Sequence, residues 1–201
     1  MKEQLDDIKA IREMMEKSSK FLSLSGLSGV TAGVTAIAGA AFGYFFLTSE
    51  TSASDFSYEQ RAAIMVADAL IVLIISFGFA VYFSSKNAKK RNQKLFNKVT
   101  LRTLYNLGIP LAAGGIFSLI MIYRGNVELI APATLIFYGL ALVNASKFMY
   151  EEVHYLGLTE IVLGILAAVF MYHGLLFWTL GFGVCHIIYG AIMYKKYDLK
   201  K

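Results

Sequence analysis

The sequence has little of what holds a soluble or disulfide-stabilised domain together. It contains one cysteine, Cys185, in 201 residues, so an internal disulfide framework is excluded. Charged residues make up only 16% of the chain and hydrophobic residues 57%, with a mean hydropathy of +0.57. This balance excludes an ordinary soluble domain. The charged stretch that precedes the first apolar run has the wrong order for a signal peptide, so we expect no cleavable one.

The sequence also offers few residues for catalysis or metal binding. Its three histidines, His154, His173 and His186, are predicted at different depths of the membrane, so no two of them can bind one haem. Cys185 and His186 are adjacent and therefore point about 100° apart on a helix, which is poor geometry for shared ligation. A GxSG string around Ser28 resembles the serine motif of rhomboid intramembrane proteases, but no His-x3-Asn pair accompanies it. We therefore predict a protein that is not an enzyme and has no cofactor or metal.

Six apolar runs are each long enough to cross a hydrocarbon core of about 30 Å as a helix. They cover residues 21–47, 62–83, 101–123, 127–149, 155–172 and 175–194. We therefore predict an all-α polytopic membrane protein with six transmembrane helices in one spanning domain, residues 21–194. An amphipathic helix, residues 1–20, precedes this domain, and a basic tail, residues 195–201, follows it.

The first span consists largely of Gly, Ala, Ser and Thr, from Ser23 to Gly43. Small residues let helix backbones approach closely enough for dispersion contacts that lipid cannot match. We therefore predict that this span is central, with other helices packed around most of it. The glycines predicted to pack against other helices are Gly26, Gly29, Gly33, Gly39, Gly43, Gly108, Gly115, Gly157, Gly164 and Gly190.

The glycines also indicate an internal repeat. Pairs seven residues apart lie near the start of the odd-numbered spans: Gly26 and Gly33, Gly108 and Gly115, Gly157 and Gly164. Aromatic-glycine pairs recur in the even-numbered spans: Phe77-Gly78, Tyr138-Gly139, Tyr189-Gly190. These patterns predict three helical hairpins in parallel orientation, related by a pseudo-three-fold axis along the membrane normal. The alternative is that glycines, which are common in membrane helices, align by chance.

The last hairpin resembles a known repeat. It begins with Gly164-Ile165-Leu166 and closes with Ile188-Tyr189-Gly190. This pattern is similar to the repeat of the HdeD-like acid-resistance membrane proteins, which are small six-span proteins of the bacterial inner membrane. The likeness is strongest over residues 107–196, and the acidic loop at 48–61 is not part of it. The resemblance implies a stress-linked inner-membrane protein and supplies no catalytic residues.

Basic residues predict the orientation. Of 19 lysines and arginines, 17 fall on one side of the predicted topology, and only Arg61 and Arg124 fall on the other. By the positive-inside rule both termini are cytoplasmic. The linker between the second and third spans has no acidic residue and only one aromatic residue, Phe96, so we expect it to bind anionic lipid headgroups and not nucleic acid. Its basic residues are Lys86, Lys89, Lys90, Arg91, Lys94, Lys98 and Arg102.

Residues 1–20 contain Leu5, Ile8, Ile11 and Met15, which recur at spacings of three and four. This spacing predicts one amphipathic helix. Such a helix lies on the membrane surface or on the protein's own cytoplasmic face, or else it docks a cytoplasmic protein partner.

Ionisable residues within spans are the candidate site. Asp68, Glu160 and His186 each cost about 3 kcal/mol to insert unless they are paired or hydrated. The turn at His173-Gly174 lies midway between Glu160 and His186 in sequence, so the two are predicted to be level and to form a buried pair, either as structural glue or as a proton relay. Asp68 either lies on a transport pathway or is a carboxylate that snorkels to the surface or pairs with Arg61.

Two functions follow from these features. We predict a membrane protein that acts without catalysis by associating with a partner or a lipid surface, and a homo-oligomer is compatible with this function. The alternative is a small-solute or proton transporter or channel that uses Asp68, Glu160 and His186.

Overall fold

The structure is a computed structural model that describes residues 24–90 and 97–199, without the side chains of 52 and 53. These residues form helices and short connections, with no strand among them. Six helices are long and apolar enough to cross a membrane: Gly26–Thr48, Tyr58–Lys90, Lys98–Tyr123, Val127–Phe148, Glu151–Val169 and Met171–Asp198. The predicted all-helical, six-span membrane class is therefore confirmed. The predicted amphipathic helix at 1–20 lies outside the described residues.

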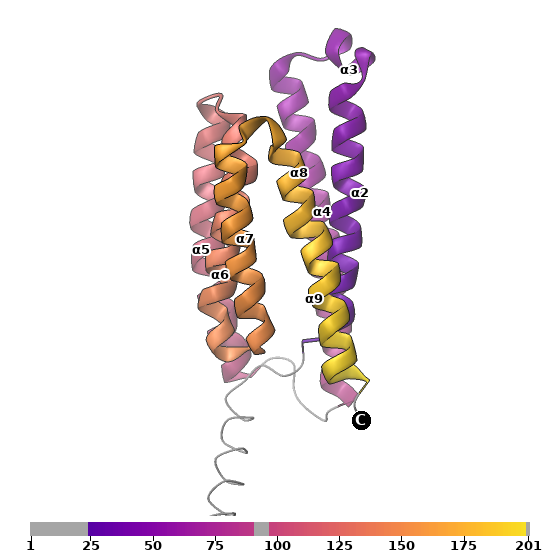
Figure 1. The fold of residues 1–201 in the computed structure, drawn as a ribbon, viewed down its shortest axis with the longest axis vertical. Helices are drawn as coiled ribbons and strands as arrows, with labels where there is room; N and C mark the ends of the chain where they lie inside the picture. The colour runs from indigo at the N-terminus through magenta and orange to yellow at the C-terminus, as the bar shows by residue number, and fades with distance from the viewer. Residues whose placement is uncertain (1–23, 91–96, 200–201) are drawn as a thin grey trace, which may run out of the picture.

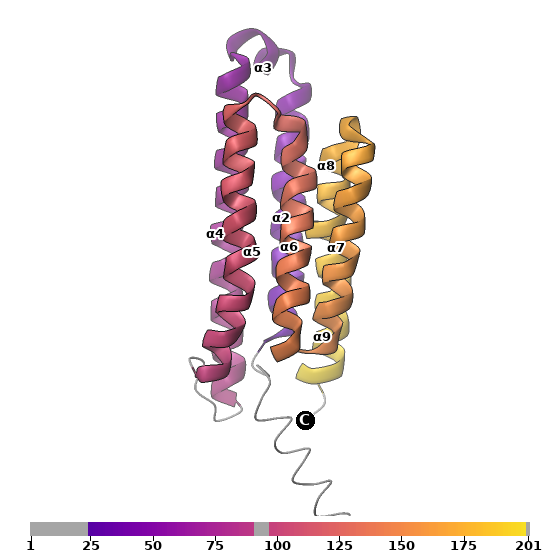
Figure 2. The same cartoon turned by 90° about the vertical axis from the view of Figure 1, so that its left-hand side faces the viewer.

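The spanning helices run side by side along the long axis of the molecule (Figures 1 and 2). The first three are α2 (Gly26–Thr48), α4 (Tyr58–Lys90) and α5 (Lys98–Tyr123), and the short helix α3 (Glu50–Asp55) joins α2 to α4. The fourth span consists of η1 (Val127–Leu129), α6 (Ile130–Ala145) and η2 (Ser146–Phe148), and the fifth is α7 (Glu151–Val169). We refer to the two ends of the bundle as the α3 end and the C-terminal end.

The sixth span is the least regular one. It consists of η3 (Met171–His173), α8 (Gly174–Trp178), the π-helical segment η4 (Thr179–Cys185), α9 (His186–Met193) and the π-helical segment η5 (Tyr194–Asp198). It therefore continues into the residues predicted as a separate basic tail. The second span is likewise longer than predicted, because α4 runs on to Lys90 through part of the basic linker.

The helices pack as an open ring. α2 packs against α4 on one side and against α9 and η4 on another, α7 packs against α6 and α8, and α6 packs against α5. α4 and α5 are not packed together along their length. The prediction that α2 is surrounded by other spans is therefore wrong. Its glycines contact only these two neighbours, the sixth span at Gly26, Gly29 and Gly33 and α4 at Gly39 and Gly43, and large side chains of α2 such as Phe45 are exposed.

Two of the helix interfaces bring backbones into contact at glycines. A Cβ added to Gly157 would lie 2.8 Å from the carbonyl oxygen of Gly139, and one added to Gly190 would lie 2.6 Å from that of Gly26. No side chain fits at such distances, so α6 and α7, and likewise α9 and α2, approach this closely only because glycine lacks a Cβ. Five further predicted glycines contact neighbouring helices: Gly29 and Gly33 meet the sixth span, Gly39 meets Val72, Gly43 meets Met65, and Gly164 meets Ile136.

Gly108 and Gly115 differ from the prediction. A Cβ added to either would meet nothing within 4 Å, so neither packs against another helix of the chain. α5 instead contacts α6 through Gly114, against Phe137. One residue turns a helix face by about 100°, so the predicted packing face is wrong by that rotation.

The C-terminal end is held together by Asp198. Its carboxylate accepts hydrogen bonds from the Ser25 hydroxyl (2.9 Å), the Gly26 backbone N–H (3.0 Å) and the Asn87 side-chain amide (3.2 Å). A carboxylate at a helix N-terminus satisfies a free backbone donor and complements the helix dipole. The last residues of the sixth span therefore cap the first one and also contact the end of α4.

Candidate functional site

The structure brings Glu160 and His186 together in the interior of the bundle. Glu160 lies on α7 and is 0% exposed, and His186 begins α9 and is 6% exposed. Glu160 Oε1 lies 3.4 Å from His186 Nδ1. This is the arrangement that the position of the turn in the last hairpin predicts.

Two further residues complete a polar cluster around His186. The backbone carbonyl of Gly181 lies 3.0 Å from His186 Nδ1, and the Tyr138 hydroxyl lies 2.8 Å from Nε2. Because a carbonyl oxygen only accepts, we assign the ring proton to Nδ1, and the Tyr138 hydroxyl then donates to Nε2 of a neutral ring. We call Tyr138, Glu160, Gly181 and His186 the buried cluster.

The π-helical segment η4 positions this cluster. His186 follows η4 directly, and its side chain bonds to a carbonyl five residues earlier in the chain. Gly181 lies in the same segment, and a Cβ there would clash with Glu160 Oε2 and with Leu135. Single π-helical turns are rare and occur often at functional sites. The sequence did not reveal Gly181 as a site residue, because helical periodicity gives no signal for a π turn. Tyr138 lies on α6, and the sequence indicates it only as part of an aromatic-glycine pair.

Glu160 is the unsatisfied member of the cluster. Neither of its carboxyl oxygens has a hydrogen-bond partner, and its separation from His186 Nδ1 exceeds the usual hydrogen-bond length. A buried carboxylate without donors is costly, and a proton shared with the imidazole reduces that cost. A small movement of Glu160 toward Nδ1 would therefore let the Nδ1–H donate a hydrogen bond to the carboxylate as well.

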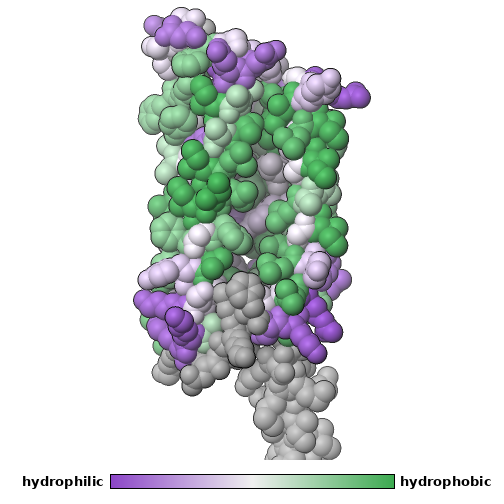
Figure 3. All heavy atoms as spheres, turned by 180° about the vertical axis from the view of Figure 1, so that it is seen from behind, coloured by the Kyte–Doolittle hydropathy of each residue, from purple (hydrophilic) through white to green (hydrophobic). Residues whose placement is uncertain are grey.

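A cavity of about 380 Å³ lies nearer the α3 end, between α2, α4, the start of α6 and α8. Figure 3 shows a hollow on the face formed by α4 and α5, with hydrophobic surface on both sides of it and hydrophilic residues at both ends of the molecule. The cavity walls are mostly apolar, and Asp68 supplies their only carboxylate. The other lining residues used below are Arg61, Met65, Ile130 and Trp178.

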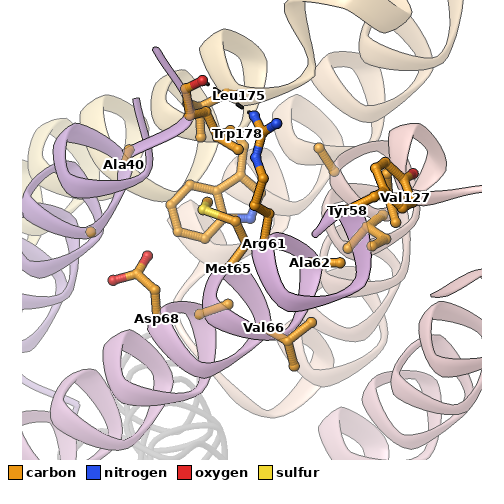
Figure 4. A pocket seen from close by; sticks show the side chains of 15 residues that line it. Ala40, Tyr58, Arg61, Ala62, Met65, Val66, Asp68, Val127, Leu175 and Trp178 are labelled. Carbon is orange, nitrogen blue, oxygen red and sulfur yellow. Dashed lines mark hydrogen bonds between the residues drawn. The ribbon is translucent and has the colours of Figure 1, made fainter. Parts of the chain in front are cut away.

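Asp68 and Arg61 do not pair. The Arg61 guanidinium donates to the backbone carbonyl of Leu47 at 3.3 Å, and Figure 4 shows it directed away from the Asp68 carboxylate. Among the described residues, no ion pair with Asp68 is seen. The alternative in which Arg61 neutralises Asp68 is therefore not the observed arrangement. Asp68 also lies apart from the buried cluster, so the three predicted site residues occupy two places.

Aromatic rings connect the cavity to the buried cluster. Trp178, which lines the cavity, has its ring centroid 4.9 Å from that of Phe182. The Phe182 ring is in turn 5.0 Å from the Tyr138 ring and 6.0 Å from the His186 ring.

The predicted headgroup-binding residues lie at the C-terminal end where they are described. Five of them are exposed on the last turns of α4 and the first turns of α5: Lys86, Lys89, Lys90, Lys98 and Arg102. Arg91 and Lys94 lie outside the described residues. In the described part of the chain, no group of three or more His, Cys, Asp or Glu side chains is arranged to hold a metal ion.

A comparison of the chain with family models, with curated proteins and with solved structures finds no match. The resemblance to the HdeD-like proteins therefore stays a prediction, and the case for a function rests on the two polar places and the rings between them.

Proposed function

We propose that this protein is a small membrane transporter that moves an organic cation with an apolar body, coupled to the movement of protons. The observation that carries the proposal is the chain of contacting rings, Trp178 to Phe182 to His186, between the cavity and the buried cluster. Through these rings, a molecule in the cavity can affect the surroundings of the Glu160–His186 pair without touching it.

The cavity supports a cation as the solute. Asp68 is its only carboxylate and has no basic partner among the described residues, so a positively charged group would complete the site. The Trp178 ring can add a cation–π contact, and the apolar walls suit a hydrophobic body. The cavity volume of about 380 Å³ lies within the range of small-molecule sites.

The buried cluster supports proton coupling more than purely structural glue. A carboxyl group kept for glue would be expected to use its oxygens in hydrogen bonds, since buried polar groups are rarely left unpaired. Both oxygens of Glu160 are unpaired, and a hydrogen-bonded imidazole lies beside them. The cluster therefore resembles a site that gains or loses a proton during a working cycle.

The predicted orientation, membrane and lipid contacts are part of the same proposal. With both termini cytoplasmic in a bacterial inner membrane, the cavity would lie toward the outer surface and the exposed lysines toward anionic headgroups. The three-hairpin repeat and the absence of catalysis are part of the same proposal. Association through residues 1–20 stays a prediction, because those residues lie outside the described part of the chain.

The test is cation flux into proteoliposomes. Ethidium, an aromatic monocation, fluoresces when it reaches DNA trapped inside vesicles, and a pH gradient supplies the driving force. We expect Asp68→Asn and Glu160→Gln each to reduce the protein-dependent rate at least tenfold. Glu128→Gln, which makes the same change in charge at an exposed helix start, should leave the rate unchanged. A rate equal to that of empty vesicles, or equal in all variants, would contradict the proposal.

A further inference from the structure

The two glycine interfaces are built alike. Between α6 and α7, Gly139 meets Gly157, and a Cβ added to Gly164 would lie 2.6 Å from Ile136 Cγ1. Ile136 lies three residues before Gly139 in the even-numbered span, and Gly157 and Gly164 lie seven residues apart in the odd-numbered span. The interface between α9 and α2 has the same two spacings.

Between α9 and α2, Gly190 meets Gly26, and a Cβ added to Gly33 would lie 2.6 Å from Ile187 Cγ1. The same side chains therefore fill the same gaps in both interfaces. Each interface joins the even-numbered span of one hairpin to the odd-numbered span of another.

The chain contains the residues for a third such interface, and it is open. α4 carries Ile75 three residues before Gly78, and α5 carries Gly108 and Gly115 seven residues apart. A Cβ added to any of these three glycines would meet nothing within 4 Å. We call Ile75, Gly78, Gly108 and Gly115 the α4–α5 seam.

We propose that α4 and α5 close along this seam, so that Gly78 packs against Gly108 and Ile75 fits against Gly115, and that closure gates the cavity from the lipid side. α4 lines the cavity, and the hollow in Figure 3 lies on the face that α4 and α5 form, so the open seam leaves the cavity accessible from that face. The inference does not depend on which solute the cavity takes or on proton coupling.

The partner of α4 in the closed seam is α5 of the same chain. Both filled interfaces are made within one chain, and only seven residues, 91–97, connect α4 to α5. None of the four seam residues is charged, so their contact brings no charged side chain into the seam. If α5 did not pack against α4, the seam side of α4 would stay exposed, although it has the same residue pattern as the two filled interfaces.

Disulfide trapping tests the seam in liposomes. In a Cys185→Ser background, cysteines replace Ile75 and Gly115, and copper phenanthroline supplies the oxidant. We expect an intramolecular disulfide, detected as protection from maleimide-polyethylene glycol. The positive control is the corresponding pair across the filled interface, Ile136→Cys with Gly164→Cys, in which the Ile136 side chain that a Cβ at 164 would meet is itself replaced. The negative control places cysteines at two lipid-exposed positions of the same helices, Leu73 and Leu119.

The outcomes separate the alternatives. An intramolecular disulfide at least fivefold above the Leu73–Leu119 pair supports closure. A disulfide-linked dimer of twice the mass means that a second copy covers the seam, and it overturns the inference. No disulfide in the seam pair, with or without ethidium, while the positive control forms one, overturns it equally. Ethidium flux that is lost while the seam still closes would count against the proposed transport alone.

Discussion

Gly181→Ala provides the sharpest test of the buried cluster. The new Cβ would lie 2.6 Å from Leu135 Cδ2 and still closer to Glu160 Oε2, whereas ordinary contact begins at 3.4 Å, so both groups must retreat by at least 0.8 Å. Glu160 is 0% exposed, so its carboxyl cannot move into solvent and must shift within the interior or push its neighbours apart. Overpacking of this kind costs about 1–3 kcal/mol. The folding equilibrium should therefore fall about five- to 150-fold.

The assay is reversible unfolding in mixed detergent and SDS micelles, followed by circular dichroism. Gly115→Ala is the reference, because it makes the same change in helix propensity where nothing lies within 4 Å. Combining Gly181→Ala with Glu160→Ala removes one of the groups that clash, so the double variant should be more stable than the sum of the single effects predicts, by about 1 kcal/mol. Additivity within about 0.3–0.5 kcal/mol would refute the reasoning, because Gly181 would then not accommodate Glu160.

Two other predictions concern packing and topology. Gly164→Leu should lower stability by several kcal/mol in the same assay, because its side chain would meet Ile136 and the α6 backbone. Gly115→Leu should cost little in the open form, because nothing lies within 4 Å of an added Cβ. Equal costs would mean that the packed face of α7 and the open face of α5 have been assigned wrongly. In a Cys185→Ser background, a cysteine at Glu50 should react with an impermeant maleimide added to intact cells, and a cysteine at Lys89 should react only after the membrane is broken. The reverse labelling would mean that the basic residues predict the wrong orientation.

The sequence predicts the fold class and the buried pair well, because both depend on simple geometry. Span lengths follow from hydropathy, and the pairing of Glu160 with His186 follows from their equal distance to one turn. Contacts at Gly26, Gly157 and Gly190 are predicted for a similar reason, since a glycine in a membrane helix usually marks a close approach.

Other features depend on information that periodicity does not contain. The face on which α5 packs is decided by which neighbour is present, so Gly108 and Gly115 are open although their spacing matches that of the packed glycines. The π-helical segment shifts the register of the sixth span and brings the Gly181 carbonyl to His186, which no 3.6-residue pattern predicts. The cavity arises where helices fail to meet, and a sequence gives no direct signal for such a gap.

The contact of Asp198 with the start of α2 also determines the order in which the molecule can be completed. The backbone N–H of Gly26 and the carboxylate that accepts its hydrogen bond are separated by 172 residues. At synthesis rates of about 5–20 residues per second, roughly 10–30 s pass between the emergence of the two groups from the ribosome. During this time α2 can pair with α4 but has neither its cap nor its glycine partner in the sixth span. α2 therefore reaches its final surroundings only after the sixth span has been made, and a chain cut before Asp198 leaves the start of α2 without its cap.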